Sequence, residues 1–179
     1  MRAVLQRVLN ASVTINNVQV SSINRGLCVL LGIATDDTED DLEYIIKKIL
    51  NVRVFEDETG KKMWARNVKD MGLEILCVSQ FTLYGDVTKG KKPDFHCSMK
   101  AEFSKEMYTN FISRMKQEYF EDRIKDGVFG AMMNVSLVNE GPVTLELDSR
   151  KFIYTEKKVS SSKSKNKDIK EIITSNKTV

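Results

Sequence analysis

SLVNEGPVTLEL, at residues 136–147, is the most informative stretch of this chain. Hydrophobic and β-branched residues flank Gly141-Pro142 on both sides and predict two strand segments. Proline cannot donate to the hydrogen-bond ladder of a sheet, so the chain is expected to break or turn there. An X-Pro bond also tolerates the cis form, and a preceding glycine permits an unusual backbone path. The pair is therefore either an ordinary tight turn or a segment that turns bare carbonyl oxygens outward.

A second stretch, LEILCVSQFTLYGD at residues 73–86, ends an apolar run in Ser79, Gln80, Phe81 and Thr82. Side chains alternate along a strand, so the first and third of these residues are expected to face one way and the second and fourth the other. Backbone N–H groups at a strand end can stabilise a negatively charged oxygen. These four residues are therefore candidate catalytic residues that act mainly through their backbone.

The two stretches together resemble a known family. SQFTLYG and NEGPVT are similar to the signature motifs of the D-aminoacyl-tRNA deacylases, which typically read SQFTL and NxGPVT. Further pieces match in the same order, namely LQRVLNASVTI, GLCVLLGI, KKPDF where the family usually has RPSF, and GVFGAMMNVSLVNEGPVT. The resemblance covers about residues 1–150. It implies an α/β (α+β) fold, with a mixed, barrel-like β-sheet and two main helices packed on it, in a homodimer without metal or cofactor.

The resemblance also implies an activity. The protein would hydrolyse the ester bond of D-aminoacyl-tRNA, and of glycyl-tRNA mischarged on other tRNAs, with help from the tRNA's own 2′-hydroxyl group. Each protomer would insert Gly141-Pro142, with the bond between them cis, into its partner's site. There the carbonyl groups, turned the same way by the cis bond, receive the substrate's α-ammonium group and leave no space for an L side chain. In the family the arginine at the position of Arg7 braces this segment.

Other residues are expected to contact the RNA. By the resemblance, Phe129 and Met133 help to form the pocket for the terminal adenosine, although core packing is the commoner role for such residues. Phe95 lies in the matching KKPDF piece. Lys89, Lys91 and Lys92 in the same loop can neutralise phosphates or can simply face water. Lys92 and Asp94 replace an arginine and a serine of the family pattern, which removes any bidentate arginine contact there.

Two alternatives stay open at this point. Thr82 could act as a nucleophile, although no neighbouring base is visible. The chain could also be a non-catalytic dimeric RNA-binding protein on the same scaffold.

A Ser-His-Asp triad would need His96, the single histidine, and we expect the adjacent His96 and Cys97 to point in opposite directions. Motifs for nucleotide hydrolysis, dinucleotide binding and zinc proteolysis do not occur in the chain.

Composition is that of an ordinary globular protein. The 179 residues are 41% hydrophobic and 30% charged, with three widely spaced cysteines, which favours a reducing, cytoplasmic location without a membrane partner. We expect a deacylase domain at residues 1–154 and a disordered Lys/Ser-rich tail at residues 155–179. Residues 156–179 hold seven lysines and three acidic residues, so their net charge is +4. The whole chain has a net charge of +3, so the remaining residues carry a net charge of −1.

Periodicity predicts the elements along the chain. Residues 2–33 alternate as a three-stranded meander, whose third strand is apolar enough to be buried on both faces. A helix is expected after Thr38, with Asp41 completing a capping box, and a short strand at residues 52–55. Trp64 is expected to pack in the interior. A second helix is expected after Ser98. The expected core stripe of the first helix is Leu42, Ile45, Ile46, Ile49 and Leu50, and that of the second is Phe103, Met107, Phe111, Met115 and Tyr119.

Overall fold

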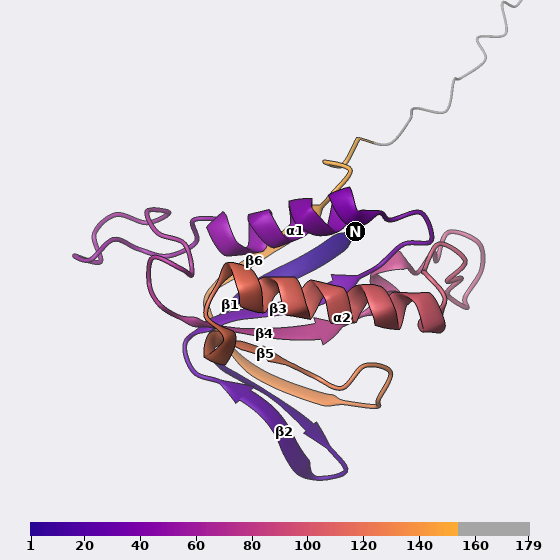
Figure 1. Ribbon diagram of the computed structural model, residues 1–179, viewed down its shortest axis with the longest axis horizontal. Helices are drawn as coiled ribbons and strands as arrows, with labels where there is room; N and C mark the ends of the chain where they lie inside the picture. The colour runs from indigo at the N-terminus through magenta and orange to yellow at the C-terminus, as the bar shows by residue number, and fades with distance from the viewer. Residues whose placement is uncertain (154–179) are drawn as a thin grey trace, which may run out of the picture.

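One mixed six-stranded sheet carries two helices on one face (Figure 1). The computed structural model describes residues 1–153, so the expected tail at residues 155–179 lies outside the described residues. In chain order the elements are β1 (Arg2–Ile15), β2 (Val18–Ile23), β3 (Gly26–Gly32), α1 (Glu39–Asn51), β4 (Glu74–Ser79), the 3-10 turn η1 (Phe81–Tyr84), α2 (Ala101–Glu118), the 3-10 turn η2 (Glu121–Arg123), β5 (Ile124–Asp126) and β6 (Asn134–Asp148). No helix within residues 1–153 is long and apolar enough to span a membrane.

Strand β1 is the backbone of the sheet because it is paired along both edges. Its second half pairs with β2, and its first half pairs with β3 in the same antiparallel register, so Ala11 faces Ile23 and Val8 faces Gly26. Strands β2 and β3 are therefore two pieces of one return strand. The predicted meander is wrong in its pairing, because β2 and β3 both pair with β1 rather than with each other. Strand β1, with 14 residues, is long enough to pair with both.

Strand β6 runs antiparallel along the other edge of β1 for nearly its whole length. Gln6 lies opposite Thr144, whereas Val8 lies opposite Asn139, so β6 carries extra residues at this point. These residues form a bulge that contains Gly141-Pro142. The expected break is confirmed as this interruption of the ladder, whereas the alternative of a turn is wrong, because both flanking segments continue on the same partner strand.

The other side of the sheet is parallel. Strand β4 pairs with β3, and β5 pairs with β4, both in parallel. A side chain at Gly26 would lie 1.9 Å from the carbonyl oxygen of Glu74, so only glycine allows β3 and β4 to begin so close together. Strand β2 approaches β5 in space, so the sheet curls toward a closed barrel. The predicted fold class, a mixed barrel-like sheet with two helices, is confirmed.

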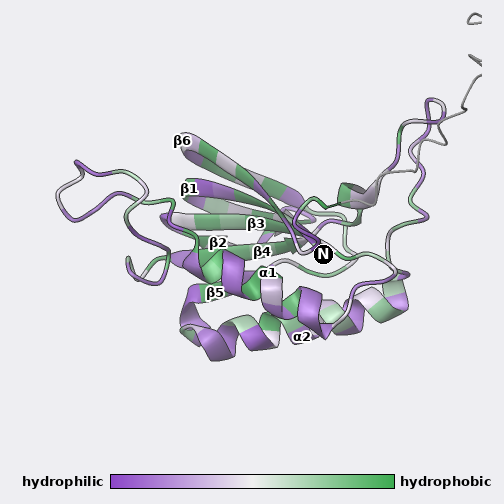
Figure 2. Ribbon diagram, turned by 90° about the horizontal axis from the view of Figure 1, so that it is seen from above, coloured by the Kyte–Doolittle hydropathy of each residue, from purple (hydrophilic) through white to green (hydrophobic). Residues whose placement is uncertain are grey.

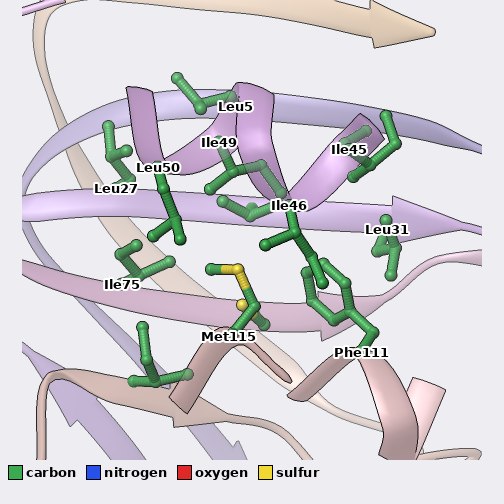
Figure 3. Close-up of a cluster of buried hydrophobic side chains, with 14 of the residues drawn as sticks. Leu5, Leu27, Leu31, Ile45, Ile46, Ile49, Leu50, Ile75, Phe111 and Met115 are labelled. Carbon is green, nitrogen blue, oxygen red and sulfur yellow. The ribbon is translucent and has the colours of Figure 1, made fainter. Parts of the chain in front are cut away.

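The main core lies between the helices and one face of the sheet (Figures 2 and 3). Thr38 precedes α1, and its backbone N–H donates to the Asp41 carboxylate at 2.8 Å, as the capping box predicts. All five predicted stripe residues of α1 are buried, at 0% exposure. They pack against the residues labelled in Figure 3 from the sheet and α2, which include Leu5, Leu27, Leu31, Ile75, Phe111 and Met115.

A second, smaller core fills the other face of the sheet. It contains Val8, Ala11, Val13, Ile23, Cys28, Leu76 and Val78. Neighbouring residues of β3, Leu27 and Cys28, belong to different cores, so β3 is buried on both faces as predicted. The curled β1, β2 and β6 therefore cover the face that the helices leave open.

Four local predictions are wrong. Helix α2 begins at Ala101 after Lys100 rather than after Ser98, and Phe103 is 58% exposed. Phe111 and Met115 of the predicted stripe are fully buried, and Met107 and Tyr119 pack against the core, as predicted. A strict spacing of four residues drifts around a helix of 3.6 residues per turn, so Phe103 at one end leaves the buried face, which Tyr108 joins. Residues 52–55 form no strand beyond an isolated bridge from Phe55. Trp64 is 55% exposed rather than packed inside.

Candidate functional site

Strand β4 ends at Ser79, and the chain turns at once into η1. The predicted alternation of side chains beyond Ser79 is wrong, because residues 81–84 form a 3-10 turn rather than strand. The Gln80 N–H donates to the carbonyl of Leu31 at 2.7 Å. Phe81 and Thr82 are the first residues of the turn, and N–H groups at that position have no acceptor within a helix. Of the predicted backbone donors, the Gln80 N–H is thus already bonded within the chain, whereas those of Phe81 and Thr82 have no acceptor within the turn.

The side chains around η1 bring one predicted RNA contact close to this site. The ring of Phe81, 57% exposed, meets the ring of Phe95 edge to face at 4.9 Å. Gln80 donates from its side-chain amide to the hydroxyl of Thr82. An isolated bridge between Asp86 and Asp94 closes the loop between them. The three predicted lysines, Lys89, Lys91 and Lys92, are exposed on this loop.

Phe129 and Met133 lie beside the same end of β4. The ring of Phe129 packs on Tyr108 at 5.6 Å, and the hydroxyl of Tyr108 donates to the carbonyl of Cys77. Gly127 donates its N–H to the same carbonyl, and a Cβ added there would lie 2.7 Å from Met133 Sδ. Both predicted residues are half-buried and pack against the edges of the two cores. Their contacts within the chain are therefore those of packing residues.

Arg7 lies at the β6 bulge, where the resemblance placed it. Its side chain is buried, and Nη1 donates to the carbonyl of Val54 at 2.6 Å. Its Nε donates to the carbonyl of Glu140 at 3.3 Å. Gly141 has φ of 119°, and a Cβ there would lie 3.3 Å from Arg7 Nη2 and 2.9 Å from the side chain of Val143. The Gly141-Pro142 bond is cis, and both residues are exposed.

Three charged residues at the bulge were missed by sequence reasoning. Arg25, in the turn between β2 and β3, donates from Nε to both carboxylate oxygens of Glu140 at 3.1 and 3.0 Å. Its Nη2 donates to Glu56 at 2.6 Å. Arg7 also contacts both carboxylates, at 3.3 Å for Glu140 and 3.9 Å for Glu56. The sequence carries no signal for this network, because its members are up to 133 positions apart.

The network shifts the protonation of its members. The Glu140 carboxylate, the largest cause, raises the pKa of Arg25 above its ordinary value. The hydrogen bond from Arg25 lowers the pKa of the Glu56 carboxyl below its ordinary value of 4.5. Both shifts favour the charged forms at neutral pH. The bulge is thus surrounded by two cations and two anions.

Within one chain the two motifs are far apart. Arg7 pairs with Leu27, and Leu27 pairs with Ile75, which lies four residues before Ser79 in β4. That offset is about 13 Å along the strands, and β6 and β4 are separated by about 14 Å across the sheet. Figure 1 shows the same separation, since the loop after α1 and the loop after η1 project from opposite ends of the molecule. The structure therefore keeps η1 and the bulge well apart within one chain.

The matching family model is described as D-Tyr-tRNA(Tyr) deacylase and covers residues 4–148. The chain belongs to this family. D-aminoacyl-tRNA deacylase 1 of Homo sapiens is 54% identical over 149 residues, which are 83% of this chain and 70% of the relative. D-aminoacyl-tRNA deacylase of Drosophila melanogaster is 52% identical over 159 residues, which are 89% of this chain and 99% of the relative. Membership confirms the resemblance on which the site was predicted.

Solved structures agree with this assignment. The structure titled c-Myc DNA Unwinding Element Binding Protein has a TM-score of 0.80 and 53% identity, and covers 83% of this chain and 98% of that chain. A structure titled as a probable eukaryotic D-amino acid tRNA deacylase has a TM-score of 0.72 at 21% identity, with 82% and 98% covered. The second likeness shows that the fold is shared.

One expectation about side chains near η1 is wrong. His96 and Cys97 do not point apart, because residues 95–98 form a turn closed by the Ser98 N–H and the Phe95 carbonyl. Cys97 Sγ lies 3.2 Å from His96 Nε2, and His96 Nδ1 lies 2.8 Å from Asp94. All three side chains are exposed. Adjacent residues in a turn can therefore meet where adjacent residues in a strand cannot.

Changing Arg25→Gln should raise the pKa of Glu56 toward 4.5, because the hydrogen bond from Arg25 is the largest cause of its shift. A depressed carboxyl pKa stabilises the fold above the unfolded-state pKa, and this contribution is lost as the pH falls through the folded-state pKa. The wild-type advantage in unfolding free energy should thus shrink below pH about 4.5. Carboxyl NMR titration and urea unfolding measure both effects. Arg114→Gln on α2 is the control, and an unshifted Glu56 in Arg25→Gln would contradict the assignment.

Proposed function

We propose that this protein hydrolyses the ester bond of D-aminoacyl-tRNA, releasing free tRNA and the D-amino acid. The observation that carries the proposal is the match to the deacylase family over residues 4–148, which includes SQFT and NEGPVT. Relatives about half identical to this chain bear the name D-aminoacyl-tRNA deacylase. We further propose that the enzyme works in the cytoplasm as a proofreading hydrolase and that residues 1–154 form its deacylase domain.

The chemistry at η1 needs little from side chains. An aminoacyl ester is already labile, so the enzyme must hold it, stabilise the oxyanion and admit a water molecule. The N–H groups of Phe81 and Thr82 are placed to bind the oxyanion. Water attacks the carbonyl carbon, the bond to the ribose 3′-oxygen breaks, and that oxygen leaves as a hydroxyl group. The neighbouring 2′-hydroxyl of the tRNA assists, so no strong side-chain base is required.

Selectivity is proposed to come from the bulge. The carbonyl groups of Gly141 and Pro142 accept hydrogen bonds from the substrate's α-ammonium group and occupy the space that an L side chain would need. A rigid backbone can exclude a stereoisomer by steric clash without contacting the D side chain. Such a site accepts many D-amino acids, and glycine also passes because it has no side chain. Glycyl-tRNA mischarged on other tRNAs is therefore a second proposed substrate.

A complete site is proposed to need two copies of the chain. The half-sites at η1 and the bulge are too far apart in one chain to hold the same aminoacyl group. Among the described residues, β6 pairs only with β1, so its outer edge is open. Leu9, Val135 and Val138 are 48%, 36% and 48% exposed on these two strands. A homodimer would cover this surface and place the bulge of one protomer at η1 of its partner.

The tRNA is proposed to approach along the loop after η1. Lys89, Lys91 and Lys92 supply counter-charges for the phosphate backbone. Phe95, which packs on Phe81 of η1, and the half-buried Phe129 and Met133 are proposed to offer apolar surface for the terminal adenosine. Aromatic side chains are common stacking partners for an unpaired base. The three lysines therefore contribute affinity, whereas the apolar residues position the ester.

Purified protein should deacylate D-tyrosyl-tRNA rapidly and leave L-tyrosyl-tRNA at its spontaneous rate, with or without a chelator. The reason is that the backbone of the bulge excludes the L side chain while no group beyond the chain and the tRNA is needed. Release of labelled tyrosine from matched esters measures both rates. Loss of neither ester, together with retained tRNA binding, would contradict the enzyme and favour the non-catalytic RNA-binding protein.

Thr82→Ala should keep single-turnover deacylation of D-tyrosyl-tRNA within about tenfold of wild type, because the backbone N–H survives the substitution. If the hydroxyl were the nucleophile, the rate would fall by several orders of magnitude. Rapid-quench measurement of the single-turnover rate distinguishes the two. Thr88→Ala, in the loop after η1, is the matched control.

Light scattering at micromolar concentration should give the mass of a dimer. Val138→Glu should shift the protein toward the monomer and lower activity, because it places a charge in the proposed interface. Val20→Glu is the control, since Val20 is 45% exposed but lies on β2. A monomeric wild type with full activity would contradict the shared site.

A further inference from the structure

Glu140, the residue immediately before Gly141, is held at both its backbone and its side chain. Its carbonyl accepts from Arg7, and its carboxylate is bound by Arg7 and Arg25. We propose that Arg25 is a positioning residue that acts through Glu140 to fix the Gly141-Pro142 segment and thereby sets the discrimination between D- and L-aminoacyl esters. The inference rests on the proposed function and deepens it by naming a residue outside both signature motifs.

Arg7 alone cannot fix the Glu140 carboxylate tightly. Its Nη1 donates to the Val54 carbonyl at 2.6 Å, which is its shortest contact. Its Nε is 3.3 Å from both the carbonyl and a carboxylate oxygen of Glu140, so one N–H is shared between two acceptors. Arg25 instead contacts the two carboxylate oxygens at 2.9 to 3.1 Å. Most of the hold on this carboxylate therefore comes from Arg25.

Arg25 is itself held in place. Its Nη2 donates to Glu56 at 2.6 Å, and its guanidinium lies 5.5 Å from the centre of the ring of Phe55. Arg7 lies 5.8 Å from the same ring, which is fully buried. Arg25 and Glu140 are 30% and 22% exposed, so their contact is partly shielded from water. The two arginines and two glutamates therefore form one cluster without net charge, and both arginines pack over the buried ring of Phe55.

The cluster has a direct consequence for the bulge. Gly141 has no side chain to anchor it and adopts a φ of 119°, so its neighbours must hold its position. The Glu140 carboxylate provides that anchor one residue away. When Arg25 is removed, the carboxylate keeps only the longer contacts to Arg7, and the following carbonyl groups gain freedom to move. Hydrogen bonding to the D ester then weakens, and space opens for the L side chain.

Arg25→Gln should lower kcat/KM for D-tyrosyl-tRNA about tenfold and raise the rate on L-tyrosyl-tRNA by about the same factor. The opposite signs are the decisive feature, because a loss of folded protein lowers both rates together. Arg114→Gln is the matched control, since Arg114 is 25% exposed and pairs with Glu43 on α1 at 3.1 Å. The control should leave both rates and their ratio unchanged.

Glu140→Gln gives a second, independent measurement, because it keeps the shape of the side chain and removes its charge. It should change both rates in the same directions, and the double variant with Arg25→Gln should be no worse than the poorer single variant. A D/L ratio that stays at the wild-type value in folded Arg25→Gln or Glu140→Gln overturns the inference while the proposed function stands. A wild-type protein without activity on the D ester overturns both.

Discussion

The pairing of β1 with β6 is the constraint on which the site depends. Gln6 and Val8 are only two residues apart, yet their partners, Thr144 and Asn139, are five apart. The extra residues cannot join the ladder, so they leave it at a fixed place opposite Arg7. The long pairing on both sides of the bulge holds its ends. An exposed Gly-Pro segment with an unusual backbone is thereby held against β1, the strand that is paired along both edges.

The same sheet separates the chemistry into two halves. Strand β4, buried among the parallel strands, ends at η1 and presents backbone N–H groups. Strand β6, paired only with β1 among the described residues, presents carbonyl groups at its bulge. The donors that we propose for the oxyanion and the acceptors that we propose for the ammonium group thus lie at different places on one sheet. The proposed homodimer would bring these two places together, because within one chain the sheet holds them at a fixed separation.

Selectivity built from backbone requires support from side chains behind it. Arg7 lies on the buried side of the bulge, and the partly exposed Arg25 forms an ion pair with the neighbouring Glu140. Breaking a shielded ion pair leaves a charge without its partner, which is why such clusters tend to hold one geometry. The cluster therefore converts a flexible glycine into a fixed surface. The half-site at η1 needs less support, because the end of β4 is already bonded to β3 through Gln80 and Leu31.

The sequence by itself determined those features that local pattern controls. The capping box at Thr38, the apolar stripe of α1 and the double burial of β3 follow from spacing and composition along short segments. The family resemblance rested on two motifs that are also local, and it placed Arg7 at the bulge. Only the tertiary structure decided the rest. The pairing of β3 with β1, the bulge instead of a turn, the face of α2, the contact of His96 with Cys97, and the cluster around Arg25 all depend on which distant strand edges and charges meet. These contacts between distant segments are set by the packing of the whole chain, so no single segment of the sequence predicts them.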